Sequence, residues 1–258
     1  MIKRLQNIIN KCIPFLALGV ILVVWQIMSS MDVVPKFMLP SPFDVIRAFL
    51  GDFGLLMNHA KTTLIEAFLG LLLGIILGFL IAVIMDQFAT AYRAIYPVVI
   101  ITQTIPTVSI APLLVLWLGY GILPKITLII ITSFFPITIG LLEGFRSADP
   151  DAVKLLKAMG ANEIQRFIHI KLPSSMGHFF SSLKISVSYS MIGAVVAEWL
   201  GGESGLGVYM TRVRKSYAFD KMFAVIFFIS AISLLLMYGV KKLQYISMPW
   251  EQNIKEKI

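Results

Sequence analysis

The chain has 258 residues, of which 58% are apolar and only 14% are charged, and its formal net charge is +8. A soluble domain carries about 25% charged residues, so this composition argues against a water-surrounded core. The basic residues lie mainly between and beside long apolar runs, which favours membrane topology over a nucleic-acid-binding face. Cys12 is the only cysteine, so a disulfide within the chain is excluded.

The first apolar run extends from Cys12 to Met31 and follows Lys3, Arg4 and Lys11. It resembles a secretory signal peptide in outline. However, it is longer than the roughly 7–15 apolar residues of a signal sequence, and no convincing cleavage site follows. We therefore expect this run to be a retained first span.

Apolar stretches of spanning length recur along the whole chain. A helix needs about 20 apolar residues to cross a membrane, and open sheets are excluded because their backbone groups stay unpaired in lipid. We expect one all-α polytopic transmembrane domain over residues 1–258. Both termini are expected in the cytoplasm, because Lys and Arg are more frequent in the segments that would then be cytoplasmic. The predicted spans are Ile13–Met28, Leu64–Met85, Ala94–Leu118, Ile126–Leu142, Phe179–Leu200 and Met222–Val240.

The outer segment after the first span carries a helix-start signal. Ser41 suits the N-cap, Pro42 the first helical position and Asp44 the third, where its charge favours the helix start. We expect a short helix lying on the outer surface.

The second span contains glycines in a small-xxx-small row at Gly70, Gly74 and Gly78. Such a row predicts close helix packing in lipid, against a helix either of this chain or of a second copy. Glu66 lies near the outer end of the span and is a functional candidate that can also reach the interface. Asp86, at the inner end, is interpreted as an interfacial stop.

The third span is interrupted by Pro97, Pro106 and Pro112. Broken helices at mid-membrane often form substrate sites in transporters, whereas the alternative is a kinked helix whose hydroxyls bond its own backbone. We favour the pathway interpretation for Gln103 and Thr104, and the kinked-helix interpretation for Thr107 and Ser109, with Ser109 kept as a further pathway candidate.

The cytoplasmic segment 143–173 predicts two short amphipathic helices. Asp149 and Pro150 start the first, and Gly160 suits the left-handed turn that ends it. Asn162 can cap the second, and Pro173 is expected to prevent it from continuing unbroken into the fifth span. The pair either covers the inner mouth of this bundle or presents an apolar ridge to a groove on a soluble partner. The apolar face of the first helix comprises Ala152, Leu155, Leu156 and Met159.

Gly160, followed after nine residues by Ile170-Lys171-Leu172-Pro173, matches the second half of the cytoplasmic signature of bacterial ATP-binding cassette (ABC) importer permeases. The chain resembles that family, whose signature begins with Glu-Ala-Ala where Lys154-Leu155-Leu156 stand here. Further segments also resemble the family, closest to the branch that imports nitrate, sulfonates, taurine and thiamine-pyrimidine precursors. They are Leu39–Pro42, Pro106, Pro112-Leu113 with Trp117-Leu118-Gly119, and Ala197-Glu198 with Ser204–Gly207.

The resemblance implies a type I importer permease whose coupling-helix loop inserts into a cleft on a separate ATPase subunit. It further implies a bacterial inner-membrane location, a substrate-binding protein that delivers the solute, a second permease copy in a homodimer, and ATP bound only by the partner subunit. The residues expected to couple to the ATPase are Asp151, Ala152, Leu155, Leu156, Met159, Gly160, Ala161, Phe167, Ile170, Leu172 and Pro173.

The fifth span carries a small, weakly polar stripe that either lines a channel or packs against a neighbour, with packing favoured. Its members are Ser186, Ser190, Gly193 and Ala197. Ser190 and Glu198 are the pathway candidates here. Glu198 lies at the outer end of the span, where it can also reach the interface, and an acid inside a membrane is a functional candidate by default. The basic residues that follow attract an anion or an acidic protein face, or form a solvated loop; they are Arg212, Arg214, Lys215 and Lys221.

The sequence contains no phosphate-binding P-loop and no hydrolase motif. Its histidines lack the spacing of metal ligands; they are His59, His169 and His178. We therefore expect no catalytic residue, metal or cofactor on this chain, and transport energised by a partner. The alternative is a secondary transporter driven by an ion gradient. It predicts paired buried acids or broken helices repeated in both halves, and the sequence displays neither. The substrate stays undecided between a small anion and a thiamine-pyrimidine precursor.

Overall fold

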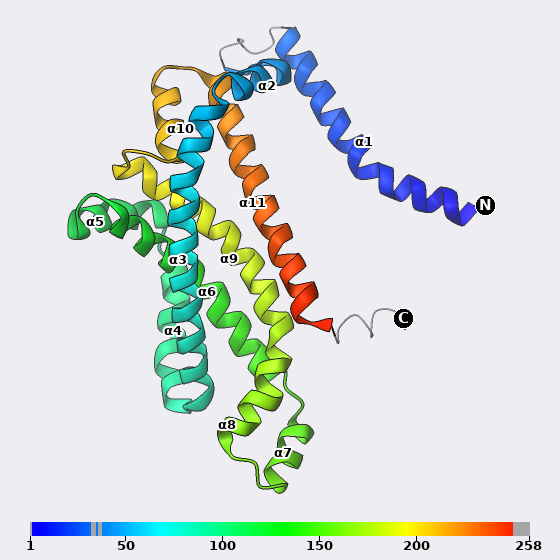
Figure 1. The fold of residues 1–258 in the computed structure, drawn as a ribbon, viewed down its shortest axis with the longest axis vertical. Coiled ribbons are helices and arrows are strands. Elements are labelled where there is room, and N and C mark those ends of the chain that lie inside the picture. The colour runs from blue at the N-terminus through cyan, green and yellow to red at the C-terminus, as the bar shows by residue number, and fades with distance from the viewer. Residues whose placement is uncertain (1, 32–34, 36–37, 250–258) are drawn as a thin grey trace. The chain divides into compact units, whose positions relative to one another are not determined.

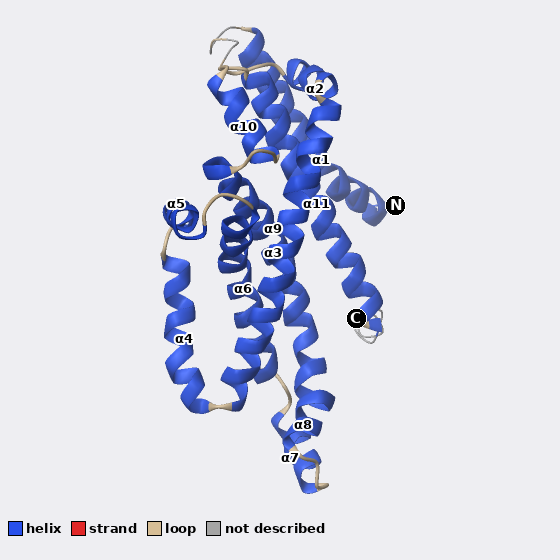
Figure 2. Cartoon of the chain, turned by 60° about the vertical axis from the view of Figure 1, so that its left-hand side comes forward, coloured by secondary structure: helices blue, strands red, loops and turns tan. Residues whose placement is uncertain are grey.

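The computed structural model describes residues 2–31, 35 and 38–249, and the regular elements in these ranges are all helices (Figure 2). The predicted all-α class is confirmed. In chain order the elements are α1 (Ile2–Ser30), α2 (Pro42–Gly51), α3 (Phe53–Gln87), α4 (Ala89–Thr104), α5 (Thr107–Leu118), α6 (Ile122–Arg146), α7 (Pro150–Ala158), α8 (Glu163–Arg166), the π-helical turn η1 (Phe167–Lys171), α9 (Leu172–Gly201), α10 (Leu206–Lys215) and α11 (Phe219–Ser247).

Four helical runs in the described part of the chain are long and apolar enough to cross a membrane. They are α3, α6, the continuous run Glu163–Gly201, and α11. The pair α4 and α5, bent by 100° at its break, would make a fifth, whereas the apolar part of α1, Leu16–Ser30, is shorter. The count of six spans and their organisation as one domain therefore stay predictions.

The chain divides into two compact units. The first comprises Met1–Asn58 and Tyr209–Phe228, and the second comprises His59–Val208 and Ile229–Ile258.

The first unit is built on aromatic contacts and a capped helix. The Trp25 ring lies 5.7 Å from the rings of both Phe223 and Phe227, and its indole N–H donates to the Pro40 carbonyl at 3.0 Å. The predicted start of α2 is confirmed, because Ser41 and Asp44 form a reciprocal capping box. Pro40 is therefore held by a side chain of α1 and directly precedes the capped start of α2.

The second unit is organised around α6, which packs extensively on α9. A Cβ atom placed on Gly144 would lie 2.6 Å from Ser175, and one placed on Gly193 would lie 3.0 Å from Thr132. Small residues therefore bring the two backbones close together, as expected where helices associate in lipid. The packing interpretation of the stripe on the fifth span is consistent with this arrangement.

The glycine row of α3 also packs on α6. A Cβ atom on Gly70 would lie 2.5 Å from Ile129, and one on Gly78 would lie 2.9 Å from the Phe134 carbonyl oxygen. Gly74 faces Ser133 in the same way. The question that the sequence left open is thereby answered, because the partner of this row is a helix of the same chain.

We expect Gly70→Val to lower the free energy of unfolding by about 1–3 kcal/mol, because the added atoms must displace the Ile129 side chain or separate the two helices. Gly239→Val is the matched control, since Gly239 lies in α11 and a Cβ atom placed on it would have nothing within 4 Å. Thermal unfolding of both variants in detergent measures the difference. Equal unfolding midpoints would contradict close packing of α3 on α6.

The expectation that Pro173 interrupts the helix before the fifth span is wrong. The helical run continues without a break from Glu163 to Gly201. Proline lacks an N–H group and its ring clashes with the preceding turn of an α-helix. Here that turn is the π-helical η1, in which the Leu172 N–H bonds to the Phe167 carbonyl, five residues back. The wider turn accommodates the proline ring, as π-bulges do elsewhere.

Candidate functional site

The segment between α6 and α9 forms the two predicted short helices. The Asp149 carboxylate accepts the Asp151 N–H at 2.9 Å and caps α7, and Gly160 adopts a φ of +87° after its end. Asn162 and Gln165 form a second capping box, with both bonds at 2.8 Å. The helix starts and the glycine turn predicted from the sequence are confirmed. Figure 1 shows α7 and α8 beyond the ends of α6 and α9.

Large apolar side chains of this segment are exposed. Leu155 is 64% exposed, Met159 76% and Ile164 68%. A lid over the inner mouth of the chain's own bundle would bury these side chains against that bundle. Their exposure therefore favours the alternative, in which the segment presents them to another protein.

Other predicted coupling residues form the root of the segment. Phe167 and Leu172 pack against the core cluster of the second unit, and the Phe167 ring lies 5.1 Å from the ring of the fully buried Phe145. The predicted coupling set therefore separates into an exposed tip and a packed root. The root fixes where the tip emerges from the bundle.

The broken helix α4–α5 carries the polar pathway candidates of the third span. The axis turns by 100° at Ile105–Pro106, and both figures of the whole chain show α5 running across the direction of α4 (Figures 1 and 2). Thr104 and Ser109 are exposed beside the break, and Gln103 is half-buried. The Thr104 hydroxyl donates to the Ile101 carbonyl at 2.8 Å, as the kinked-helix interpretation expects. Non-helical backbone at membrane depth must face protein or a water-filled cavity. The exposed surface at the α4–α5 break is therefore expected to contact protein or water and not lipid.

The two candidates of the fifth span lie inside the chain. Ser190 is 1% exposed and donates to the Val187 carbonyl, and Glu198 is 1% exposed. The Glu198 carboxylate accepts the Thr63 hydroxyl at 2.7 Å and the Gly207 N–H at 2.6 Å. Their burial separates both residues from the exposed surface at the α4–α5 break. The contacts of Glu198 are those of a structural anchor for the chain that follows α9.

Side chains of α3 hold the same stretch of chain. His59 Nδ1 accepts the Gly205 N–H at 2.9 Å, and the Thr63 hydroxyl oxygen accepts the Leu206 N–H at 2.8 Å. Gly205 has a φ of +127° and passes so close to Glu198 that no Cβ fits there. Three side chains from two helices therefore bind three successive peptide N–H groups.

A buried ion pair completes this polar cluster. Lys125 Nζ donates to Glu66 Oε1 at 2.6 Å, and the two side chains are only 8% and 4% exposed. Glu66 and Glu198 are both buried inside the chain, so the expectation that the chain lacks paired buried acids is wrong. Sequence reasoning missed His59, Thr63 and Lys125. The signal for the first two was present, since His59, Thr63 and Glu66 recur at helical spacing on one face.

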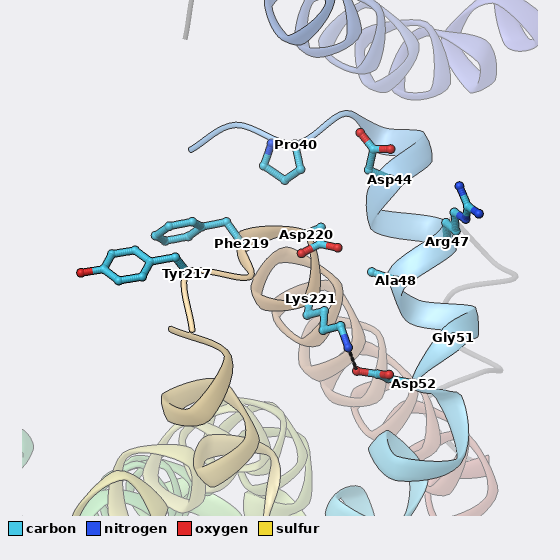
Figure 3. A pocket seen from close by; sticks show the side chains of 10 residues that line it. All are labelled: Pro40, Asp44, Arg47, Ala48, Gly51, Asp52, Tyr217, Phe219, Asp220 and Lys221. Atoms are coloured by element: carbon cyan, nitrogen blue, oxygen red, sulfur yellow. Dashed lines mark ion pairs between the residues drawn. The ribbon is translucent and has the colours of Figure 1, made fainter. Parts of the chain in front are cut away.

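The first unit contains an open cleft of about 700 Å³ lined by charged and aromatic side chains (Figure 3). Lys221 and Asp52 form an ion pair of 2.8 Å in it, and the Tyr209 hydroxyl donates to Asp52 at 2.7 Å. Of the predicted basic cluster, Lys221 is thus engaged with an acid, while Arg214 and Lys215 are exposed on α10. The lining residues are Pro40, Asp44, Arg47, Ala48, Gly51, Asp52, Tyr217, Phe219, Asp220 and Lys221.

The stability of the first unit should depend on pH through Asp52. The hydrogen bond from Lys221 holds the pKa of the Asp52 carboxyl below its ordinary value of 3.8, against the opposing effect of burial and with help from Tyr209. A lowered folded-state pKa stabilises the folded chain above that ordinary value, and the stabilisation is lost as the pH falls through the folded-state pKa. We expect Asp52→Asn to unfold at a lower temperature than the parent chain at neutral pH, with the gap closing in acid. A gap independent of pH in thermal unfolding experiments would contradict this.

Comparisons with known proteins all identify membrane components of transport systems as similar to this chain. The protein-family model described as "Binding-protein-dependent transport system inner membrane component" matches residues 70–244. The chain is 35% identical to the formylaminopyrimidine transport permease protein ThiX of Halalkalibacterium halodurans, over 93% of this chain and 96% of the relative. It is 27% identical to a putative aliphatic sulfonates transport permease protein of Bacillus subtilis, over 91% and 86%. A bacterial ABC transporter involved in alginate import shares the fold, with a TM-score of 0.63, 18% identity and coverage of 93% and 98%.

Proposed function

Since the chain belongs to the family of binding-protein-dependent transport system inner membrane components, and is a permease of the ABC importer class, we propose that a dimer of two copies forms its translocation pathway. The proposed partners are a separate ATPase subunit on the cytoplasmic side and a substrate-binding protein on the other side. Both termini then lie in the cytoplasm, as the bias of Lys and Arg supports.

The observation that carries this proposal is the exposed apolar tip of the segment between α6 and α9. Leu155, Met159 and Ile164 are each more than half exposed at the end of the helical pair. The same segment contains the Gly160 to Pro173 spacing of the family signature. Insertion of an apolar helix surface into a groove is a recurring mode of protein recognition. In this family the groove that would bury these side chains lies on the ATPase subunit.

The second copy is supported by the α4–α5 break. Its exposed non-helical backbone needs protein or water opposite it, and two copies facing each other would enclose that space. Gln103, Thr104 and Ser109 would then line the pathway. Ser190 and Glu198, buried within one copy, would hold its helices in place instead.

For the solute, we favour a pyrimidine precursor of thiamine over a sulfonate or nitrate. The relative named for formylaminopyrimidine is more similar to this chain than the relative named for sulfonates. In addition, residues 94–124 contain no charged side chain. A pathway lined by amide and hydroxyl groups can hydrogen-bond an uncharged heterocycle, whereas it offers an anion no compensating charge.

Purification of the tagged chain from its native membrane tests the proposal. We expect an ATPase subunit in equal amount, and uptake of labelled formylaminopyrimidine by vesicles containing the full complex, the binding protein and ATP. Uptake by vesicles that contain the chain alone and an ion gradient would contradict the ABC assignment. ATP-dependent uptake of taurine in place of formylaminopyrimidine would contradict only the choice of solute.

A further inference from the structure

The segment 147–171 is held at both of its ends by contacts with helices that precede it in the chain. At the first end, Arg146 places its guanidinium 4.2 Å from the centroid of the Tyr92 ring and donates to the Tyr92 hydroxyl at 3.3 Å. At the second end, Lys171 Nζ donates to both carboxylate oxygens of Asp86, at 2.8 and 3.0 Å. Neither contact belongs to the family signature, since Lys171 occupies its variable position.

Both contacts reach the same corner of the fold. Asp86 is the last residue but one of α3, Tyr92 lies in the first turn of α4, and only Phe88 separates the two helices. The Tyr96 ring lies 4.9 Å from that of Tyr92, which extends the Arg146–Tyr92 contact along α4. The α3–α4 corner is thus linked by side chains to the start and to the end of the segment.

The two links differ in strength. Arg146 is exposed, and a cation–π contact at an exposed site is weak. The Asp86 side chain is only 7% exposed and that of Lys171 27%, so their charge-assisted hydrogen bonds are less screened by water. Lys171 also lies inside the continuous helical run Glu163–Gly201. A displacement of α8 therefore carries Lys171 with it and acts on Asp86 more directly than on Tyr92.

The corner leads into the broken helix. From Ala89, α4 runs as one helix to Thr104, directly before the 100° turn into α5. A shift of its first turn is transmitted along this helix to the break. We propose that the Asp86–Lys171 ion pair is a positioning link that passes ATPase-driven movement of the segment to the α4–α5 break. This inference rests on the proposed function.

The test uses the complex of the permease with its ATPase subunit, and a single reporter cysteine, Thr104→Cys, in a Cys12→Ser background. The readout is the ATP-dependent change in the rate at which a water-soluble maleimide labels residue 104. We expect Asp86→Asn and Lys171→Gln each to leave ATP hydrolysis intact and to reduce this change about tenfold, the scale on which residues along a coupling network act. The reversed pair, Asp86→Lys with Lys171→Asp, should recover most of the change.

Lys184→Gln is the matched control, because Lys184 lies further along the same helical run and donates to Gln244 of α11 at 2.7 Å. It should label as the parent complex does. Two outcomes would overturn the link in a complex that retains its ATPase. One is an ATP-dependent change in labelling that equals the parent's in both single variants, and the other is a reversed pair in which this change is reduced as much as in the single variants. Absence of the ATPase from the parent complex would instead overturn the proposed function. In that case hydrogen exchange of residues 89–104 in the isolated chain decides, since Asp86→Asn should accelerate it and unchanged exchange would overturn the link.

Discussion

Leu155→Asp should release the ATPase subunit and abolish ATP-dependent uptake. Leu155 is 64% exposed on α7, so an apolar groove on the partner is the environment that the proposed function assigns to it. A carboxylate in that environment loses its hydration without gaining a partner. Truncation of a central apolar contact alone costs about 2 kcal/mol or more of binding free energy, which is about a thirtyfold loss of affinity, and the introduced charge adds to this loss.

The matched control is Lys157→Asp, which places a carboxylate on the same helix two residues further on. Positions two residues apart on a helix do not face the same side, and Lys157 is exposed. Co-purification of the ATPase and ATP-dependent uptake should be retained in this variant. If Leu155→Asp kept the ATPase in equal amount, or if both variants lost it alike, the apolar tip would not be the docking surface.

The second large effect is expected at the buried ion pair of α3 and α6. Glu66→Leu leaves the Lys125 ammonium, only 8% exposed, without its carboxylate at 2.6 Å. Removal of one partner of a buried pair costs about 3–5 kcal/mol, because the remaining charge is uncompensated. We therefore expect Glu66→Leu to yield little folded protein from membranes, and what is recovered to unfold at a much lower temperature than the parent chain.

The double variant Glu66→Leu with Lys125→Met separates charge compensation from other causes. Replacement of a buried pair by apolar side chains of similar volume is often neutral, so the double variant should recover most of the lost stability. Lys154→Met is the control, because its ion pair with Asp151 is 76% and 86% exposed and such pairs contribute little. A double variant as unstable as Glu66→Leu alone would falsify this account of the cluster.

The features that the sequence predicted correctly depend on neighbouring residues. The capping box at Ser41 and Asp44, the caps at Asp149 and Asn162, and the turn at Gly160 are each specified within a few positions of the chain. The apolar runs likewise reveal most spans, since lipid imposes the same requirement on each helix. These signals can be recognised without knowledge of which helices pack against one another.

What the sequence did not reveal depends on contacts between distant segments. Span prediction placed the start of the second span at Leu64, whereas α3 begins at Phe53, because its first turns carry polar side chains. Two of these, His59 and Thr63, are buried, and they accept N–H groups from residues 205–206, far away in the chain. The Asp86–Lys171 contact joins residues 85 positions apart. Hydropathy reports none of these pairings.

The buried ion pair of Glu66 with Lys125 also bears on how the chain is made. Synthesis starts at the N-terminus, so α3 brings Glu66 to the bilayer before α6 arrives with Lys125. The ammonium then enters beside a carboxylate already in place, and the glycines of α3 allow the two helices to associate at once. Glu198 is synthesised after both members of the pair, shortly before the chain that it anchors. We therefore expect membrane insertion of α6 to be assisted by a helix made earlier, because a ribosome-bound intermediate that ends after α6 already contains both members of the pair.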